Sequence, residues 1–307
     1  MKFRRKMPIA VLAIVAAVGF ISCGGPHFAK SGSQIIDAKD ALAMVQKGGV
    51  VLVDAQTGVK YNKEHADGAV NIGRADIVVN TPYPNLVADK AQFEKVMQSR
   101  GISNDSTVVV YDDSKNMDAA RLWWTMVAYG HDPEKVKVIS GGLAAMKAAG
   151  SAMSSGRTTP ASSSYTAKDL DTSMIASLAD VKAQVNNPDP NTVILDTRTT
   201  EEVEAGTIPG SVHIDYENNN FSDNTYRPVQ QIRIDYLEKE IDPSKTVIMF
   251  CKTSIRGAQS YVALYNAGYR NLKLYDGAWV EWYSKPSLPV QMPEKSELPA
   301  LNSQDGS

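Results

Sequence analysis

Cys251 is the residue of this chain whose type and position are best suited to covalent chemistry. It comes directly after the apolar residues 247–250, a run that predicts a buried strand. In open parallel sheets, ligands bind at the carboxyl ends of the strands. A free cysteine inside a strand is usually a small buried apolar residue. At the end of a strand, before a polar loop and a helix, the thiol is better explained as a nucleophile.

A short loop of six residues separates this strand from a predicted helix that runs to about Ala267. The loop consists of Cys251, Lys252, Thr253, Ser254, Ile255 and Arg256. Backbone N–H groups at the start of a helix favour anions, and Lys252 and Arg256 add two positive charges. These surroundings favour the nucleophilic thiolate. The loop is therefore predicted to hold an anionic substrate or a persulfide, unless Arg256 points to solvent.

The other cysteine, Cys23, closes a segment with the features of an export signal. Residues 2–6 contain four positive charges, and residues 7–21 contain none. That uncharged stretch is shorter than the roughly 18 residues expected of a spanning helix. Ser22 and Gly24 flank the cysteine, a pattern similar to a bacterial lipobox. It predicts a lipid on Cys23 and a protein tethered in the cell envelope, outside the cytoplasm; an ordinary signal peptide is the alternative.

The composition excludes several classes of protein. The chain has 307 residues, 43% of them apolar, and a net charge of −2 with only two cysteines. This length suggests two domains. Two cysteines cannot form a dense disulfide framework, and Cys/His zinc patterns are absent, so neither a metal nor a cofactor is predicted. Because acidic and basic residues are nearly balanced, the composition does not indicate a basic surface for binding nucleic acid.

Strand and helix patterns alternate along the chain. Six apolar runs predict buried strands: residues 50–53, 107–111, 136–139, 192–195, 246–250 and 272–275. Helical stretches lie between them. This alternation predicts an α/β fold in which each domain has a mainly parallel sheet with helices on both faces.

The two halves of the chain repeat each other. Residues 51–54 match 193–196 at an offset of 142, and two landmarks farther along match at offsets of 138 and 136. Offsets that change so little along the chain indicate an internal duplication. In this repeat Asp112 takes the place of Cys251, and a carboxylate cannot act as a sulfur nucleophile. One half is therefore predicted to be catalytic, and the other to be structural or to shape the cleft.

Composition also sets the predicted boundaries. Residues 154–164 contain no large apolar side chain, and four prolines follow from residue 286 onward. The predicted divisions are a signal peptide (1–22), a tether (23–34), a non-catalytic domain (35–150), a linker (151–169), a catalytic domain (170–285) and a flexible tail (286–307).

The chain resembles the tandem-domain rhodanese-family sulfurtransferases. The matching motifs are Asp196-Thr197-Arg198, residues 206–211, the cysteine loop and residues 275–279 with Trp282, together with residues 120–124 and 129–131 in the first half. Their order and duplication make the resemblance specific. It implies two tandem rhodanese-like domains, of which the second is catalytic.

The resemblance also implies a mechanism. The Cys251 thiolate would take sulfur from a small anionic donor, thiosulfate or 3-mercaptopyruvate, and pass it to a thiol or to cyanide. The cationic loop slightly favours thiosulfate-like donors. Arg198 matches a position that contacts substrate in some members, although pairing with Asp196 or Glu201 is an equally good interpretation.

Three positions depart from the family pattern or qualify it. Ser254 stands where glycine is frequent, and Thr207 replaces the usual histidine. His65 keeps that histidine in the first half, where it is predicted to be a packed residue rather than a proton carrier.

Two other functions are weighed against sulfur transfer. A related cysteine phosphatase needs an arginine six positions beyond the cysteine, where this chain has Gly257. The second alternative is a tethered persulfide carrier or binding module that has little turnover and depends on a partner protein. Turnover with a small acceptor would separate a carrier from an enzyme. The oligomeric state is left open, with a monomer favoured.

Overall fold

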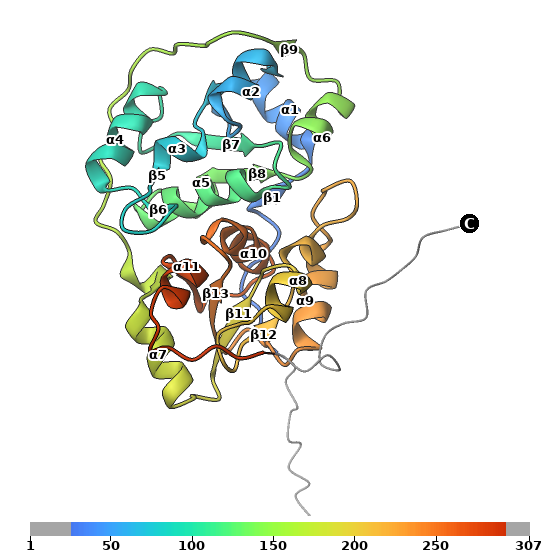
Figure 1. The fold of residues 1–307 in the computed structure, drawn as a ribbon. Helices are drawn as coiled ribbons and strands as arrows, with labels where there is room; N and C mark the ends of the chain where they lie inside the picture. Colours follow the sequence, from blue (N-terminus) through green and yellow to red (C-terminus); the bar gives the residue numbers. More distant parts are fainter. Residues whose placement is uncertain (1–25, 293–307) are drawn as a thin grey trace, which may run out of the picture.

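The computed structural model describes residues 26–292, and these form two halves with the same topology (Figure 1). Each half is built on a five-stranded sheet, with the order β1-β8-β7-β2-β4 in the first and β10-β14-β13-β11-β12 in the second. Within both sheets all neighbouring strands are parallel. The predicted α/β class with two tandem domains is confirmed.

The central strands coincide with the predicted apolar runs. The first sheet contains β1 (Ile35–Ile36), β2 (Val50–Asp54), β4 (Val70–Asn71), β7 (Thr107–Tyr111) and β8 (Val136–Ile139). The second contains β10 (Ile175–Ala176), β11 (Thr192–Asp196), β12 (Val212–His213), β13 (Thr246–Phe250) and β14 (Leu272–Tyr275). The two-residue edge strands were not predicted, because two residues show no periodicity.

Helices cover both faces of each sheet. The first half has α1 (Ala38–Lys47), α2 (Gly58–Lys63), α3 (Arg74–Ile77), α4 (Lys90–Ser99), α5 (Met117–Ala128) and α6 (Gly142–Ala148). The second has α7 (Leu178–Asn186), α8 (Thr200–Glu204), α9 (Val229–Leu237), α10 (Ile255–Asn266) and α11 (Ala278–Tyr283). Asp37 precedes α1, Gly48 follows it, and Ser177 forms a capping box at the start of α7.

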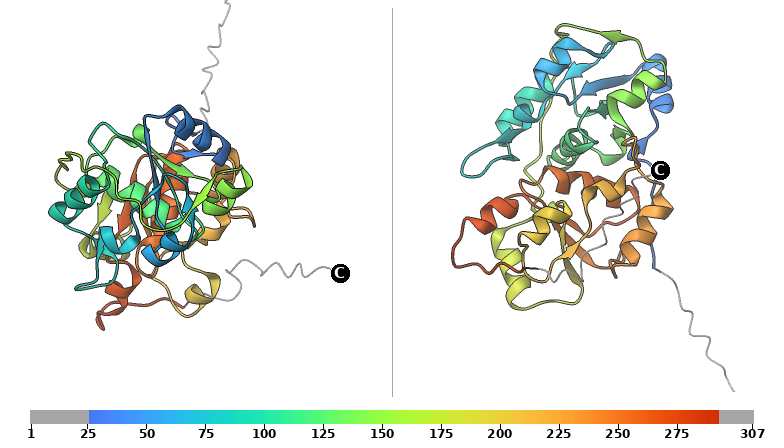
Figure 2. Two further views of the ribbon diagram at one scale, coloured as in Figure 1. Left: turned by 90° about the horizontal axis from the view of Figure 1, so that it is seen from above. Right: turned by 45° about the vertical axis from the view of Figure 1, so that its right-hand side comes forward.

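Helices α5 and α10 pack against each other between the two halves (Figure 2). The Trp123 ring of α5 lies 5.1 Å from the ring of Tyr265 and 6.4 Å from that of Tyr261, both on α10. Buried side chains of the two halves form one continuous apolar cluster. Because α5 and α10 are the helices that follow the Asp112 and Cys251 loops, this packing brings both loops to the boundary between the halves.

The described part of the predicted tether, residues 26–34, is bound to the second half. The Ala29 N–H donates to the Gly268 carbonyl at 2.9 Å, and the Phe28 ring meets the Tyr269 ring edge-on at 5.4 Å. Gln34 is fully buried. These residues of the predicted tether therefore lie on the folded body, because their backbone finds partners at the end of α10.

The predicted linker follows the surface of the first half. The short strand β9 (Met153–Ser154) pairs antiparallel with β3 (His65–Ala66). The Gly156 N–H donates to the Asn62 carbonyl at 2.8 Å, and the Tyr165 side chain is buried against Phe93. A segment without large apolar side chains cannot build a core, yet its backbone still docks on one.

The start of the predicted tail is also docked. Gln291 and Thr207 exchange two backbone hydrogen bonds of 2.8 and 2.9 Å, and the Trp282 indole N–H donates to the Pro289 carbonyl at 2.9 Å. Residues 286–292 therefore belong to the folded second half, which corrects the predicted boundary at 286.

Two predicted features lie outside the described residues: the export signal at 1–22 and the lipid site at Cys23. Residues 293–307 lie outside them as well. Within residues 26–292, no helix is long and apolar enough to cross a membrane.

Candidate active site

Cys251 follows the last residue of β13, and its side chain is only 1% exposed. Helix α10 begins at Ile255, so the turn is shorter than predicted and Arg256 is the second residue of the helix. The reason is Ser254, which adopts the left-handed conformation with φ of 64° and turns the chain directly into the helix. The end of the helix, at Asn266, agrees with the prediction. Ile255 points into the core at 4% exposure.

The backbone donors around this turn have no protein acceptor. Among residues 26–292, the N–H groups of residues 252–257 donate to no other group. The next N–H along the chain, that of Ala258, is the first to bond, to the Ser254 carbonyl at 3.0 Å. Unpaired N–H groups in the first turn of a helix form its positive end. The turn that carries Cys251 therefore offers an open set of donors to an anion.

In the equivalent turn of the first half, a carboxylate of the protein accepts from the backbone donors. One carboxylate oxygen of Asp112 accepts from the N–H groups of Ser114 and Asn116, both at 3.0 Å. The other oxygen accepts from Asp118 at 2.8 Å and from Ala119 at 2.9 Å. Burial raises the pKa of Asp112 to about 6, while these hydrogen bonds act in the opposite direction. The first half thus supplies its own anion, whereas the second half leaves the place open.

The two predicted cations of the loop have different surroundings. Lys252 is exposed at the rim. Arg256 lies beside Cys251 and forms two hydrogen bonds to the Glu202 carboxylate, one of them at 2.9 Å. Burial acts to lower the pKa of Arg256, but the contacts with Glu202 and Cys251 outweigh it and raise the pKa.

Glu202 is a residue of the site that the sequence analysis missed. It belongs to α8, where it forms a capping box with Thr199. Burial opposes its ionisation, but the contact with Arg256 lowers the pKa of Glu202 overall. The capping box was visible in the sequence, but 54 residues separate Glu202 from Arg256, and no pattern connects them. Of the two loop cations, Arg256 has a carboxylate partner and Lys252 has none within the described residues.

Arg198 is 2% exposed, and all three of its guanidinium nitrogens donate within the protein. Nη2 contacts the Asp196 carboxylate at 2.6 Å and the Gly206 carbonyl at 2.7 Å. The guanidinium also stacks on the Trp279 ring, 4.3 Å from its centroid. The structure therefore shows the pairing with Asp196, and Arg198 supports the end of the sheet.

The first half contacts the cysteine loop through α5. The fully buried Arg121 donates to the Ser254 hydroxyl at 3.1 Å and pairs with the Asp276 carboxylate at 2.8 Å. The Ser254 hydroxyl donates to the same carboxylate at 3.0 Å. Arg121 and Asp276 both lie in the motifs that carried the family resemblance, but spacing alone assigned them no role. Together they hold Ser254, the left-handed residue of the turn that carries Cys251.

A second contact comes from the hairpin of β5 (Val78–Val79) and β6 (Leu86–Val87). The Asn85 side-chain amide donates to the Thr253 hydroxyl at 2.9 Å, and the Asn85 carbonyl accepts from Arg121 at 3.0 Å. The non-catalytic half therefore shapes the loop at two adjacent positions.

Packing agrees with the interpretation of the remaining residues. A Cβ on Gly257 would lie 2.8 Å from a Leu274 methyl group, so this position has no room for the arginine of a phosphatase. His65 is 1% exposed, stacks on the Tyr61 ring and bonds to the Tyr61 carbonyl at 2.8 Å. Thr207 donates to Asp196 at 2.6 Å. Within the described part of the chain, no three His, Cys, Asp or Glu side chains are grouped to hold a metal.

Comparison with known proteins adds a family and named relatives. The model of the "Rhodanese-like domain" matches residues 37–149 and 177–285. A Mycobacterium bovis protein that bears the name thiosulfate sulfurtransferase 1 is 28% identical over 260 residues, covering 79% of this chain and 91% of its own. A Pseudomonas aeruginosa protein that bears the name 3-mercaptopyruvate sulfurtransferase is 28% identical over 284 residues, covering 85% and 98%.

The fold also matches a solved structure. The Escherichia coli 3-mercaptopyruvate sulfotransferase SseA superposes with a TM-score of 0.72 at 21% identity, and the match covers 80% of this chain and 99% of that one. At this identity the likeness concerns the fold. It extends over both halves of the chain.

Proposed function

This chain belongs to the rhodanese-like domain family as a tandem rhodanese-type sulfurtransferase, and on that premise we propose that it moves a sulfane sulfur through a persulfide on Cys251. One observation carries the proposal. The donors of residues 252–257 beside Cys251 have no acceptor in the described part of the chain, whereas Asp112 fills the equivalent donors of the first half. A thiolate or a persulfide supplies the negative charge that this turn is built to hold.

The proposed transfer has two steps. The Cys251 thiolate attacks the outer sulfur of thiosulfate, the donor S–S bond breaks, and its electron pair leaves with sulfite. With 3-mercaptopyruvate the C–S bond breaks instead, and the released pyruvate takes up a proton. A thiol or cyanide then attacks the outer sulfur of the persulfide, and the Cys251 thiolate leaves. The loop N–H groups would stabilise both charged forms of Cys251.

Donor choice follows from the charges at the rim. Lys252 is exposed and free to meet an anion, while Glu202 neutralises Arg256. The loop therefore presents less positive charge to the donor than Lys252 and Arg256 would without Glu202. A site with this lower charge can bind the monoanionic 3-mercaptopyruvate as well as thiosulfate. Because Cys251 is 1% exposed, the donor must displace rim side chains to reach it.

The sulfur acceptor would come from outside the chain. The sequence holds only Cys23 and Cys251, so with Cys23 acylated no second protein thiol can resolve the persulfide. If the physiological acceptor is a protein, the chain would act as a tethered persulfide carrier, and turnover with a small acceptor would then be low.

We also propose that Cys23 carries the lipid and that the protein is exported and anchored at the cell envelope. Only four residues separate Cys23 from Phe28, which packs on the second half, so the tether would hold the body close to the membrane. Fractionation of cells that express Cys23→Ala tests this. The variant should leave the membrane fraction, and a variant that stays there contradicts lipid attachment.

The activity test uses protein without residues 1–22. Thiosulfate or 3-mercaptopyruvate is supplied with cyanide, and thiocyanate is measured. Cys251→Ser should reduce the rate by at least about a thousandfold, because it removes the nucleophile. Cys23→Ser is the matched control and should keep the full rate. Absence of thiocyanate with both donors, or turnover by Cys251→Ser, overturns the assignment.

A further inference from the structure

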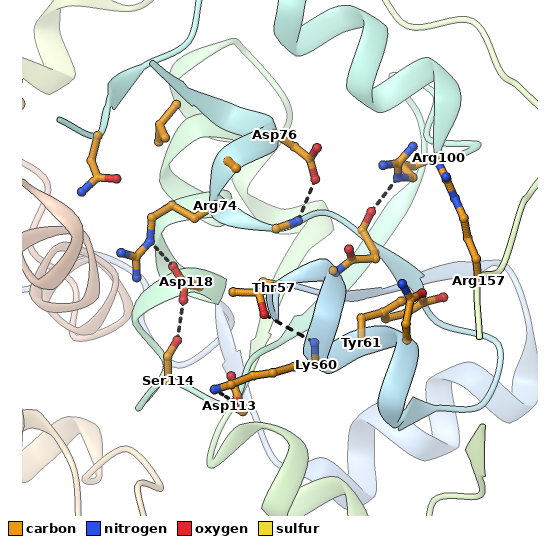
Figure 3. A pocket seen from close by; sticks show the side chains of 18 of the residues that line it. Thr57, Lys60, Tyr61, Arg74, Asp76, Arg100, Asp113, Ser114, Asp118 and Arg157 are labelled. Carbon is orange, nitrogen blue, oxygen red and sulfur yellow. Dashed lines mark hydrogen bonds and ion pairs between the residues drawn. The ribbon is translucent and has the colours of Figure 1, made fainter. Parts of the chain in front are cut away.

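A cavity of about 650 Å³ lies in the first half, and the Cys251 loop contributes none of its lining residues (Figure 3). Its walls come from the segments that follow β2, β4 and β7 and from the interdomain linker. This is the carboxyl edge of a parallel sheet, where open α/β folds bind ligands. Its volume falls within the range of sites for small organic molecules.

Most charges in the wall neutralise one another. Lys60 pairs with Asp113 at 2.5 Å, and Arg74 pairs with Asp118 at 2.6 Å. Asp76, the third carboxylate of the wall, accepts from the Gly73 N–H at 2.9 Å at the start of α3. Each carboxylate therefore already has a partner.

Two arginines of the wall have no carboxylate partner among residues 26–292. Arg100 donates to the Asn71 carbonyl at 2.5 Å and to the Ser99 hydroxyl at 2.9 Å, both neutral acceptors. Arg157, on the linker, forms no ion pair or side-chain hydrogen bond within residues 26–292 and is exposed. In Figure 3 the two side chains lie on the same side of the cavity, and Arg157 runs toward Arg100. Two like charges on one wall favour an anion between them.

The backbone donors of the turn after β7 are not available to such an anion. In the turn after β7, four N–H groups already bind the Asp112 carboxylate. Guanidinium groups, such as those of the wall, bind oxyanions through two parallel hydrogen bonds.

We propose that this cavity binds a small organic molecule with a doubly charged oxyanion group, a phosphate ester or a dicarboxylate, held between Arg100 and Arg157. The cavity is far larger than an inorganic anion needs. Uncharged polar groups of Thr57, Asn62 and Asn80 lie along the rest of the wall and suit a hydroxylated body. This ligand site would be separate from the proposed sulfur-transfer site, and its binding would not depend on Cys251.

Calorimetric titration of the protein tests the proposal with three probes: inorganic phosphate, glucose 6-phosphate and malate. At least one organic probe should bind more tightly than phosphate. Arg157→Gln should weaken its binding about fivefold, and Arg100→Gln/Arg157→Gln at least about tenfold, because each guanidinium contributes charge-assisted hydrogen bonds. Lys182→Gln on α7, which changes one exposed charge outside the cavity, is the matched control and should bind like the wild type.

Arg157 makes no side-chain hydrogen bond in the described structure, so Arg157→Gln should leave the melting temperature unchanged. A change in the Kd of this variant would then reflect ligand binding and not a loss of folded protein. Cys251→Ser should bind the organic probe with the wild-type Kd, which separates this cavity from the active site. The proposal is overturned if neither organic probe binds below 10 mM, on the order of the weakest specific sites. It is also overturned if the double variant keeps the wild-type Kd or if phosphate binds as tightly as the organic probes.

Discussion

The turns after β7 and β13 occupy the same place in two copies of one fold, yet they hold different groups. Asn116 and Ser254 precede the two helices in the same left-handed conformation, with φ of 66° and 64°. In the first turn a carboxylate occupies the backbone donors, and in the second the donors beside Cys251 are open. The fold thus builds an anion site twice, and the side chain at the strand end determines whether a ligand can enter it.

The charges around the two turns are reversed. The second residue of each helix is Asp118 in α5 and Arg256 in α10. Each forms an ion pair with an arginine or a glutamate of a neighbouring helix: Asp118 with Arg74, and Arg256 with Glu202. An anionic donor would therefore meet a cation beside Cys251 and a carboxylate beside Asp112.

The contacts across the boundary differ as well. The fifth residue of each helix is Arg121 in α5 and Gln259 in α10, and both are fully buried. Arg121 reaches Ser254 directly, whereas Gln259 reaches Asn116 only through Asn220, by side-chain amide contacts of 3.1 and 3.3 Å. A charged group thus supports the catalytic turn, and neutral amides support the other one.

The largest expected effect comes from an attempt to move the chemistry to the first half. Asp112→Cys in a Cys251→Ser background should stay at least about a thousandfold below the wild type in the thiocyanate assay, because the new thiol lies beside Asp118 and lacks an arginine. The Cys251→Ser single variant is the control. Recovery to within tenfold of the wild-type rate would show that a thiol in this turn is sufficient, whatever the neighbouring charges.

Arg121→Met should lower both stability and activity. Removing one partner of a buried ion pair costs about 3 kcal/mol of unfolding free energy, and release of the Ser254 turn should lower kcat/KM about thirtyfold. The rate of Cys251 alkylation by iodoacetamide should change too, and Arg121→Lys should restore part of the wild-type rate. Gln259→Leu should lower the stability and leave the activity unchanged. If Gln259→Leu lost as much activity as Arg121→Met, the proposed difference between the two buried residues would be wrong.

The carboxyl of Asp112 should make stability depend on pH. Because the pKa of Asp112 is raised to about 6 in the folded state, the folded protein holds a proton that the unfolded chain releases at lower pH. This contribution is complete below pH 4 and is lost as the pH rises through 6. Relative to Asp112→Asn, the unfolding free energy of the wild type should fall by about 2 kcal/mol between pH 4 and pH 8 in denaturant titrations. Parallel curves for the two proteins contradict the raised pKa.

The smallest expected effect concerns the ion pair at the rim. Glu202→Gln frees Arg256 for the donor and should lower the KM for thiosulfate about fivefold, as expected for the loss of one partly exposed charge partner. Asp118→Asn breaks the corresponding pair in the first half and should leave the KM unchanged. A change of KM in both variants would mean that the first half also contributes to donor binding.

Much of the fold follows from local patterns. The runs at residues 107–111 and 246–250 match β7 and β13, because a strand buried on both faces leaves an uninterrupted apolar stretch. The short edge strands and the docked segments at 26–34 and 286–292 could not be predicted. Backbone hydrogen bonds, which most residue types can form, hold much of these segments, and their side-chain contacts are with residues far away in the sequence.

The sequence by itself determined the duplication, the strand ends, and the placement of a thiol at one of them and a carboxylate at the other. These are properties of chain order and local periodicity. Only the tertiary structure decided which side chains meet: Arg121 and Ser254 are 133 residues apart, and Glu202 and Arg256 are 54 apart. Arg198 shows the same limit, because its motif gave both Asp196 and Glu201 as possible partners and packing placed it against Asp196 and Trp279. Such pairs depend on how α5 and α10 pack and how α8 meets the catalytic turn, and no spacing along the chain encodes that geometry.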